Sequence, residues 1–88
     1  MSVYQLVYSK HAQKDAQKLA AAGLKQKALV LLEKLTKNPF QTPPPYEKLV
    51  GDLSSSYSRR INIQHRLVYQ VLEREKIIKI LRLWSHYE

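Results

Sequence analysis

The chain has 88 residues, and its 15 Lys and Arg against 7 Asp and Glu give a formal net charge of +8 at pH 7. This length supports one hydrophobic core, so we expect a single domain over residues 1–88. Hydrophobic residues make up 44% of the chain and only 2 are Gly, a composition that excludes an intrinsically disordered protein, and the lack of Cys excludes disulfides and thiolate metal sites.

The sequence also argues against secretion and membrane insertion. The N-terminal segment MSVYQLVYSKH lacks a basic stretch followed by a long apolar run, so it does not have the pattern of a signal peptide. No stretch approaches the roughly 20 apolar residues that a membrane span needs. We therefore expect a cytoplasmic protein with no membrane partner.

The N-terminal half predicts one strand and two helices. Residues 2–8 are rich in β-branched and aromatic side chains, which favour a strand. Ser9 is a suitable N-cap for a helix over 10–22, and Gly23 is a suitable end to that helix. A second helix over 24–37 carries an apolar stripe made of Leu24, Ala28, Leu31, Leu32 and Leu35. Two helices joined at one glycine predict a helical hairpin.

The C-terminal half predicts a loop and then an antiparallel meander. The loop over 38–52 contains the stiff run Pro43–Pro45. This run is either a rigid connector or a device that fixes the position of Tyr46 and Glu47. Alternating strands follow, at 57–64, 66–73 and 77–84, with a polar turn before the last. The order of elements predicts an α+β fold: an N-terminal strand, a two-helix hairpin and an antiparallel meander, with both helices packed on one face of a twisted sheet.

The arginines predict a basic face on this sheet. All five Arg occur after residue 58, and a planar guanidinium suits phosphate better than the Lys ammonium does. If paired residues of the last two strands have numbers that add to an even total, one face carries Arg66, Arg82, Trp84 and His86, beside Arg60 of the preceding strand. The opposite face then forms the core, with Leu67, Tyr69, Val71, Ile77, Leu81 and Leu83. Such a basic face suits single-stranded nucleic acid or an acidic protein, although basic residues can also serve only to keep a surface soluble.

Three residues have the types that phosphodiester cleavage needs, namely a base, a group that stabilises charge on phosphate, and an acid. Glu47, Arg66 and His86 supply these types, and a histidine titrates in the right range for an acid near neutral pH. The alternative is that Glu47 and His86 are ordinary surface residues. His65 is interpreted as a structural turn residue. Three His without a paired spacing predict no metal site, and no sequence motif predicts a cofactor.

Five segments of the second half form a specific combination. They are Pro-Tyr-Glu-Lys-Leu at 45–49, Asp-Leu at 52–53, Tyr-Ser-Arg-Arg-Ile-Asn at 57–62, His-Arg-Leu-Val-Tyr at 65–69 and Ser-His-Tyr-Glu at 85–88. In these segments the chain resembles the YoeB/Txe toxins, part of the RelE/ParE superfamily of bacterial toxin–antitoxin systems. The resemblance is detailed over 38–88 and extends to the helical half only in the order of elements. It implies a RelE-like fold.

The resemblance also implies an endoribonuclease that cleaves messenger RNA, typically within the translating ribosome and without a metal ion. It assigns the base to Glu47, the transition-state arginine to Arg66 and the acid to His86. The expected reaction is attack by a ribose 2′-OH, which gives a 2′,3′-cyclic phosphate and a 5′-OH. Arg59 and Tyr87 match positions that contact RNA in the family.

Further RNA contacts are expected from the basic face and from a departure from the family pattern. Arg60 and Trp84 are candidate contacts because both are expected on the basic face. Val50 stands where some relatives carry a Lys, so we expect Lys48 or Arg59 to take over that contact. Ser55 and Ser56 occupy a loop where many relatives have Gly, which leaves the conformation of the loop open.

The charge and the resemblance together predict the partners. We expect a cognate acidic antitoxin of the YefM/Phd-like kind, in addition to mRNA and the ribosome, and either a homodimer or a toxin–antitoxin hetero-oligomer. A second class of function stays open. ParE-type relatives share the fold but act on DNA gyrase, and a purely binding protein would use the basic face without cleaving anything.

Overall fold

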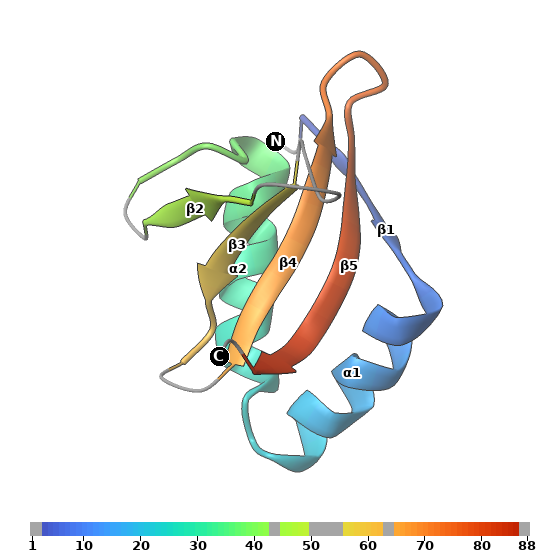
Figure 1. Ribbon diagram of the computed structural model, residues 1–88, viewed down its shortest axis with the longest axis vertical. Coiled ribbons are helices and arrows are strands. Elements are labelled where there is room, and N and C mark those ends of the chain that lie inside the picture. Colours follow the sequence, from blue (N-terminus) through green and yellow to red (C-terminus); the bar gives the residue numbers. More distant parts are fainter. Residues whose placement is uncertain (1–2, 43–44, 50–55, 63–64, 87–88) are drawn as a thin grey trace.

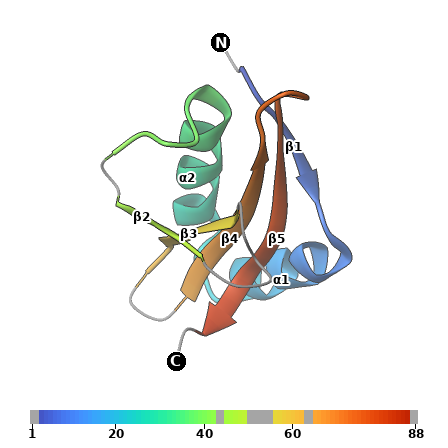
Figure 2. The ribbon, with the colours of Figure 1, turned by 45° about the horizontal axis from the view of Figure 1, so that its top comes forward.

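Five strands and two helices build the protein, as seen in the computed structural model, which describes residues 3–42, 45–49, 56–62 and 65–86 (Figure 1). The elements are β1 (Gln5–Tyr8), α1 (Lys10–Ala21), α2 (Lys25–Lys37), β2 (Tyr46–Lys48), β3 (Ser56–Arg60), β4 (His65–Leu72) and β5 (Ile77–His86). The sheet order is β1-β5-β4-β3-β2, with β1 parallel to β5 and the other neighbours antiparallel. Both helices lie behind the sheet (Figure 2). The predicted α+β fold is therefore confirmed.

Helix α1 begins and ends where local chemistry predicts. The Ser9 hydroxyl accepts a hydrogen bond from the backbone N of Ala12 at 3.0 Å and donates one to the Leu81 carbonyl at 2.8 Å. It thereby caps α1 and ties its start to β5. Gly23 has φ +75°, and the backbone N of Leu24 donates to the Leu19 carbonyl at 2.9 Å. This left-handed glycine ends α1 at low steric cost and starts the chain toward α2.

The core lies between the helices and the sheet, and the predicted stripe of α2 is part of it: Ala28, Leu31, Leu32 and Leu35 are all buried. From the sheet come Leu67, Tyr69 and Val71 of β4, as predicted. On β5 the fully buried residues are Ile78, Ile80 and Leu83, of which Leu83 was predicted, whereas Ile77 and Leu81 are half-buried. The predicted face assignment of Ile77 and Leu81 is therefore wrong.

The reason for this error is the register between β4 and β5. Tyr69 pairs with Ile80 and Val71 pairs with Ile78, so most paired numbers add to an odd total. Alternation in the sequence favoured pairs whose residue numbers add to an even total. The pair Val68–Arg82 has such a total. Register shifts on both sides of Val68 mark irregularities in the ladder. Such bulges insert residues that break strict alternation, and no alternation rule places them in advance.

Strand β2 was not predicted, because its residues were assigned to a loop. Three residues form too short a run to show alternation, and prolines precede them. In the structure β2 pairs with β3, and Glu47 lies opposite Ser58. This pairing brings the proposed base to the edge of the sheet that carries the arginines.

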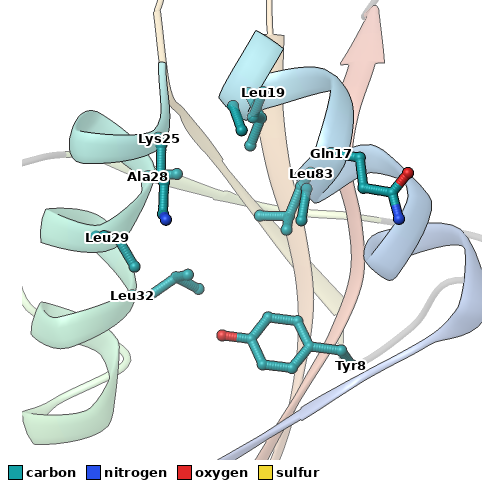
Figure 3. Close-up of a pocket in the computed structure, with 10 residues that line it drawn as sticks. Tyr8, Gln17, Leu19, Lys25, Ala28, Leu29, Leu32 and Leu83 are labelled. Atoms are coloured by element: carbon teal, nitrogen blue, oxygen red, sulfur yellow. The ribbon is translucent and has the colours of Figure 1, made fainter. Parts of the chain in front are cut away.

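A groove of about 340 Å³ lies between the two helices and β5. Figure 3 shows Tyr8, Leu29, Leu32 and Leu83 around it. Its lining is mainly apolar, and burial raises the pKa of the Tyr8 hydroxyl. The groove therefore offers apolar contact but no acid–base pair, and it lies on the helix side rather than on the basic face.

Candidate active site

The structure brings Glu47 and Arg66 together. Arg66 Nη1 lies 3.6 Å from Glu47 Oε2, although the two residues belong to strands that do not pair directly. Glu47 is opposite Ser58 on β3, and Ser58 is opposite Val68 on β4, so all three side chains point to the face away from the helices. Arg66 precedes Val68 by two residues and shares that face.

A small cavity of about 150 Å³ surrounds this pair. Its lining residues are Pro45, Tyr46, Glu47, Ser58, Arg59, Arg60 and Arg66. Arg60 is directly opposite Arg66 across the β3–β4 ladder. Two like charges opposite each other destabilise a sheet unless an anion or a carboxylate lies near them. The predicted placement of Arg60 and Arg66 on one face is confirmed, and the cavity is suited to a phosphate group.

Arg59 is held inside the protein. It is only 2% exposed, and its guanidinium donates hydrogen bonds to the Tyr69 hydroxyl at 3.0 Å and to the Pro39 carbonyl at 2.8 Å. It also lies 5.0 Å from the centre of the Tyr46 ring. Burial raises the pKa of Tyr69, and the Arg59 charge partly offsets that rise. Arg59 thus fastens β2 and the segment that follows α2 to the sheet, and its RNA contact stays a prediction.

Lys48 lies on the opposite side of β2 from Glu47. It pairs with Tyr57, whose ring packs against Phe40 and Tyr69 on the helix side. Alternation along a strand separates neighbouring side chains in this way. Lys48 is exposed, so it remains open to a partner, but the structure does not bring it to the Glu47–Arg66 pair.

The end of β5 runs beside the start of β4. Ser85 is opposite Arg66 and His86 is opposite His65, so the backbone of the proposed acid lies one residue beyond the partner of Arg66. Tyr87 lies outside the described residues. The register therefore brings the backbone segments of all three proposed catalytic residues to one region of the sheet, on β2, β4 and β5, with β3 between the first two.

Trp84 and His65 form a stacked pair. Their ring centroids are 3.7 Å apart with an interplanar angle of 24°, and His65 is only 4% exposed. The backbone N of His65 donates to the Asn62 side-chain oxygen at 2.7 Å, which closes the turn before β4. This agrees with the structural interpretation of His65. Arg66 is opposite Ser85, so alternation along β5 puts Trp84 on the other face, where it is half-buried against the core. The predicted place of Trp84 on the basic face is therefore wrong, and its contact with RNA stays a prediction.

Arg82 does not lie on the basic face, so that prediction is wrong. Its Nε donates to Asp15 Oδ2 at 2.8 Å and its Nη2 lies 3.4 Å from Asp15 Oδ1. The backbone N of Leu83 donates to the same Oδ2 at 3.0 Å. Burial alone would raise the pKa of Asp15, but the hydrogen bonds from Arg82 and the β5 backbone outweigh it and lower the pKa. The irregular ladder turns Arg82 toward α1.

Asp15 is a residue that sequence reasoning missed. It is 2% exposed and lies three residues after Ala12 and four before Leu19, on the buried stripe of α1. A carboxylate at the spacing of an apolar stripe was the available signal, because a buried charge needs a partner.

Two further properties bear on the kind of site. Within the described residues, no three His, Asp or Glu lie close enough together to hold a metal ion. None of the helices in those residues is both long and apolar enough to cross a membrane.

Comparison with known proteins identifies similar chains. A family model for YoeB-like toxins of bacterial type II toxin–antitoxin systems matches residues 6–87. Toxin YoeB of Synechocystis sp. is 37% identical over 59 residues, which are 67% of this chain and 66% of that toxin, so the match spans just under two thirds of the relative.

Solved structures match over nearly the whole chain. A YoeB/ParE toxin from Agrobacterium tumefaciens has a TM-score of 0.85 and 27% identity, covering 94% of this chain and 99% of that one. A YoeB dimer from Staphylococcus aureus has a TM-score of 0.83 and 31% identity, covering 98% and 100%. A heterotetrameric YoeB–YefM toxin–antitoxin complex from the same species has a TM-score of 0.80 and 32% identity, covering 96% and 98%.

Proposed function

Because the chain belongs to the YoeB-like toxins of bacterial type II toxin–antitoxin systems, we propose that it is an endoribonuclease that cleaves messenger RNA. The observation that carries this proposal is the Glu47–Arg66 contact of 3.6 Å in a cavity that Arg60 also lines. A carboxylate next to a guanidinium, with a second arginine opposite, provides a base and two cationic groups around the volume of one phosphate.

The proposed reaction uses the 2′-OH of the substrate as nucleophile. Glu47 takes the proton of the 2′-OH, and the oxygen attacks the adjacent phosphorus. Arg66 donates to the phosphate oxygens as negative charge builds. His86 protonates the leaving 5′-oxygen as the P–O bond breaks. The products are a 2′,3′-cyclic phosphate and a 5′-OH, and neither a metal ion nor a water molecule takes part in this step.

The openness of the Glu47–Arg66 pair supports this scheme. The Glu47 side chain is 63% exposed, and a separation of 3.6 Å is longer than a charge-assisted hydrogen bond. Exposed ion pairs of this kind are weak. A phosphate can therefore compete with Glu47 for the guanidinium, which leaves the carboxylate available to the 2′-OH.

The proposed RNA contacts differ in how directly they can act. Arg60 is exposed at the cavity and is the foremost candidate for a phosphate contact. Arg59 is proposed to support the cavity from below as well as to attract phosphate, because its guanidinium already donates to protein groups. Trp84, Tyr87 and Lys48 are proposed to contact RNA beyond the reacting phosphate.

The proposed partners follow from charge and from the relatives. A net charge of +8 favours an acidic antitoxin of the YefM/Phd-like kind, and the S. aureus relatives were solved as a YoeB–YefM complex and as a dimer. We propose that this chain forms a comparable hetero-oligomer or homodimer. We further propose that it acts in the cytoplasm on mRNA in the translating ribosome.

The test is mRNA cleavage with programmed ribosomes, followed by mapping of the 5′ ends. Glu47→Ala, Arg66→Ala and His86→Ala should each lower the cleavage rate by about 10²–10⁴. Glu33→Gln is the matched control, because Glu33 lies on the exposed surface of α2 in an ion pair with Lys37 at 3.6 Å. Full cleavage by all three variants would overturn the assignment. Arrest of DNA replication without mRNA cleavage would favour the gyrase-directed alternative.

A further inference from the structure

Ser58 carries a polar atom whose presence the fold does not explain. The residue is 1% exposed, and its Oγ has no hydrogen-bond partner within the part of the chain that the structure describes. A buried hydroxyl without a partner destabilises a folded protein, so a retained one calls for an explanation. Because Ser58 also lines the cavity at Glu47 and Arg66, a ligand in that cavity is the explanation to test.

The position of Ser58 in the sheet is central to this cavity. It is opposite Glu47 on β2 and precedes Arg60 by two residues on β3, so the three side chains share a face. Arg60 in turn is opposite Arg66. The hydroxyl therefore lies among one carboxylate and two guanidinium groups.

The other groups around the cavity limit what can accept a hydrogen bond from Ser58 Oγ. Glu47 Oε2 lies within 4 Å of Arg66 and does not accept from Ser58. The cavity of about 150 Å³ is far larger than the ~15 Å³ that one water needs. An anion between Arg60 and Arg66 would offset the repulsion of their charges and would offer oxygen acceptors to a hydroxyl donor.

We propose that Ser58 is a substrate-contacting residue whose hydroxyl donates a hydrogen bond to a non-bridging oxygen of the phosphate held between Arg60 and Arg66. The contact rests on the proposed function for its substrate, an RNA phosphodiester. It extends that function because it adds a neutral donor to the charged groups. A hydroxyl donor adds one more directional hydrogen bond to those that the two guanidinium groups can provide.

The chain offers a matched control two residues away. Ser56 is 2% exposed, points to the same face of β3 and is opposite Gln70. It does not belong to the lining of the cavity. Ser56→Ala therefore removes an equally buried hydroxyl from the same strand without touching the proposed contact.

The first experiment measures binding of inorganic phosphate to the folded protein by NMR titration. Ser58→Ala should weaken phosphate binding by about tenfold, the loss expected for one hydrogen bond to a charged acceptor. Ser58→Cys keeps nearly the same volume with a much weaker donor and should weaken binding similarly. Ser56→Ala should leave binding unchanged. Melting temperatures should stay unchanged or rise for Ser58→Ala, because the hydroxyl that is removed has no protein partner.

The second experiment uses RNA in which sulfur replaces one non-bridging oxygen at the cleaved phosphate. For the oxygen that accepts from Ser58, sulfur should slow the wild-type protein, and this effect should disappear in Ser58→Ala. A purely structural role for Ser58 would not remove the sulfur effect.

The phosphate-binding measurement tests the Ser58 contact even if the protein cleaves no RNA. Equal phosphate affinity in wild type, Ser58→Ala and Ser58→Cys overturns it, and so does a lack of phosphate binding by the wild type. Weaker binding by both Ser58 variants supports it. If both Ser58 variants bind phosphate more weakly than the wild type but the wild type cuts no RNA, the proposed function fails while the Ser58 contact stands.

Discussion

Two arginine–carboxylate pairs lie on opposite faces of the same sheet, and they are built in opposite ways. On the helix side, Asp15 is 3% exposed at its side chain and its partner Arg82 is 42% exposed. On the basic face, Arg66 is 15% exposed and its partner Glu47 is 63% exposed. One pair thus buries its carboxylate, and the other leaves its carboxylate in solvent.

The difference indicates two different uses of the same chemistry. Asp15 accepts from Arg82 and from the backbone N of Leu83, so the fold provides all its main partners at 2.8–3.0 Å. A buried carboxylate of this kind depends on those partners. Glu47 Oε2 lies 3.6 Å from Arg66 Nη1. Separating these two groups costs the fold little stability. The first pair is suited to holding α1 on β5, and the second to meeting a substrate.

The largest expected effect comes from replacing Arg66 while keeping its charge. Arg66→Lys retains a cation but loses the planar fork, so mRNA cleavage should fall by about 10²–10³. Circular dichroism and the melting temperature should stay close to those of the wild type. The matched change Arg82→Lys should preserve most cleavage and instead lower the melting temperature. Equal effects of the two changes on cleavage would remove the distinction between the pairs.

The next effect is on stability, at Asp15. Asp15→Asn removes the charge that accepts from Arg82 and Leu83, and the free energy of unfolding should fall by about 2–3 kcal/mol. Urea denaturation measures this change. Glu33→Gln on the exposed surface of α2 is the control and should change stability by less than ~0.5 kcal/mol. A loss at Asp15 no larger than that of the control would contradict a structural role for the pair.

The pH dependence of stability should separate the pairs further. The folded-state pKa of Asp15 lies below its ordinary value of 3.8, so the unfolded chain binds the proton more readily than the folded one. The stabilisation from Asp15 is therefore complete above about pH 5 and is lost as pH falls through the folded pKa. The difference in unfolding free energy between wild type and Asp15→Asn should shrink below pH 4. A difference that stays constant down to pH 2 would contradict the assignment.

The smallest effect is expected for the stability of a Glu47 variant. Glu47→Gln should lower the free energy of unfolding by ~0.5 kcal/mol or less, because the lost attraction is exposed while Arg60 and Arg66 stay opposite each other. The remaining difference should vanish in 1 M NaCl, where the screening length is only about 3 Å. A loss as large as that of Asp15→Asn would show that both pairs hold the fold together.

Much of the fold could be predicted because its signals are local. Ser9 and Gly23 mark the ends of α1, and the spacing of leucines marks the buried side of α2. Strand β2 and the β4–β5 register could not be predicted, since three residues show no alternation and bulges break it. The error at Arg82 has the same origin, because its direction depends on the irregular ladder.

Only some residues of the candidate site could be predicted, because the others give no signal in the sequence. Glu47 and Arg66 were named together from the residue types that cleavage needs and from a family resemblance, and the structure shows a contact between them that neither could measure. Ser58 was not singled out, because serine in a strand gives no signal until its burial is known. Asp15 did give a signal, through its place on an apolar stripe, and was overlooked among the lysines of α1.

The pairing of β1 with β5 has a consequence for the order in which the protein forms. β1 is the first strand along the chain, yet its neighbour in the sheet is β5, and the Ser9 hydroxyl reaches the Leu81 carbonyl across 72 positions. Contacts that close such long loops are slow to form and cannot exist in a partial chain. During synthesis, β1 and α1 can therefore make their contacts with the sheet only after β5, which also carries His86, has been made. We expect the edge of the sheet and the proposed acid to be completed together, only once the whole described chain has left the ribosome.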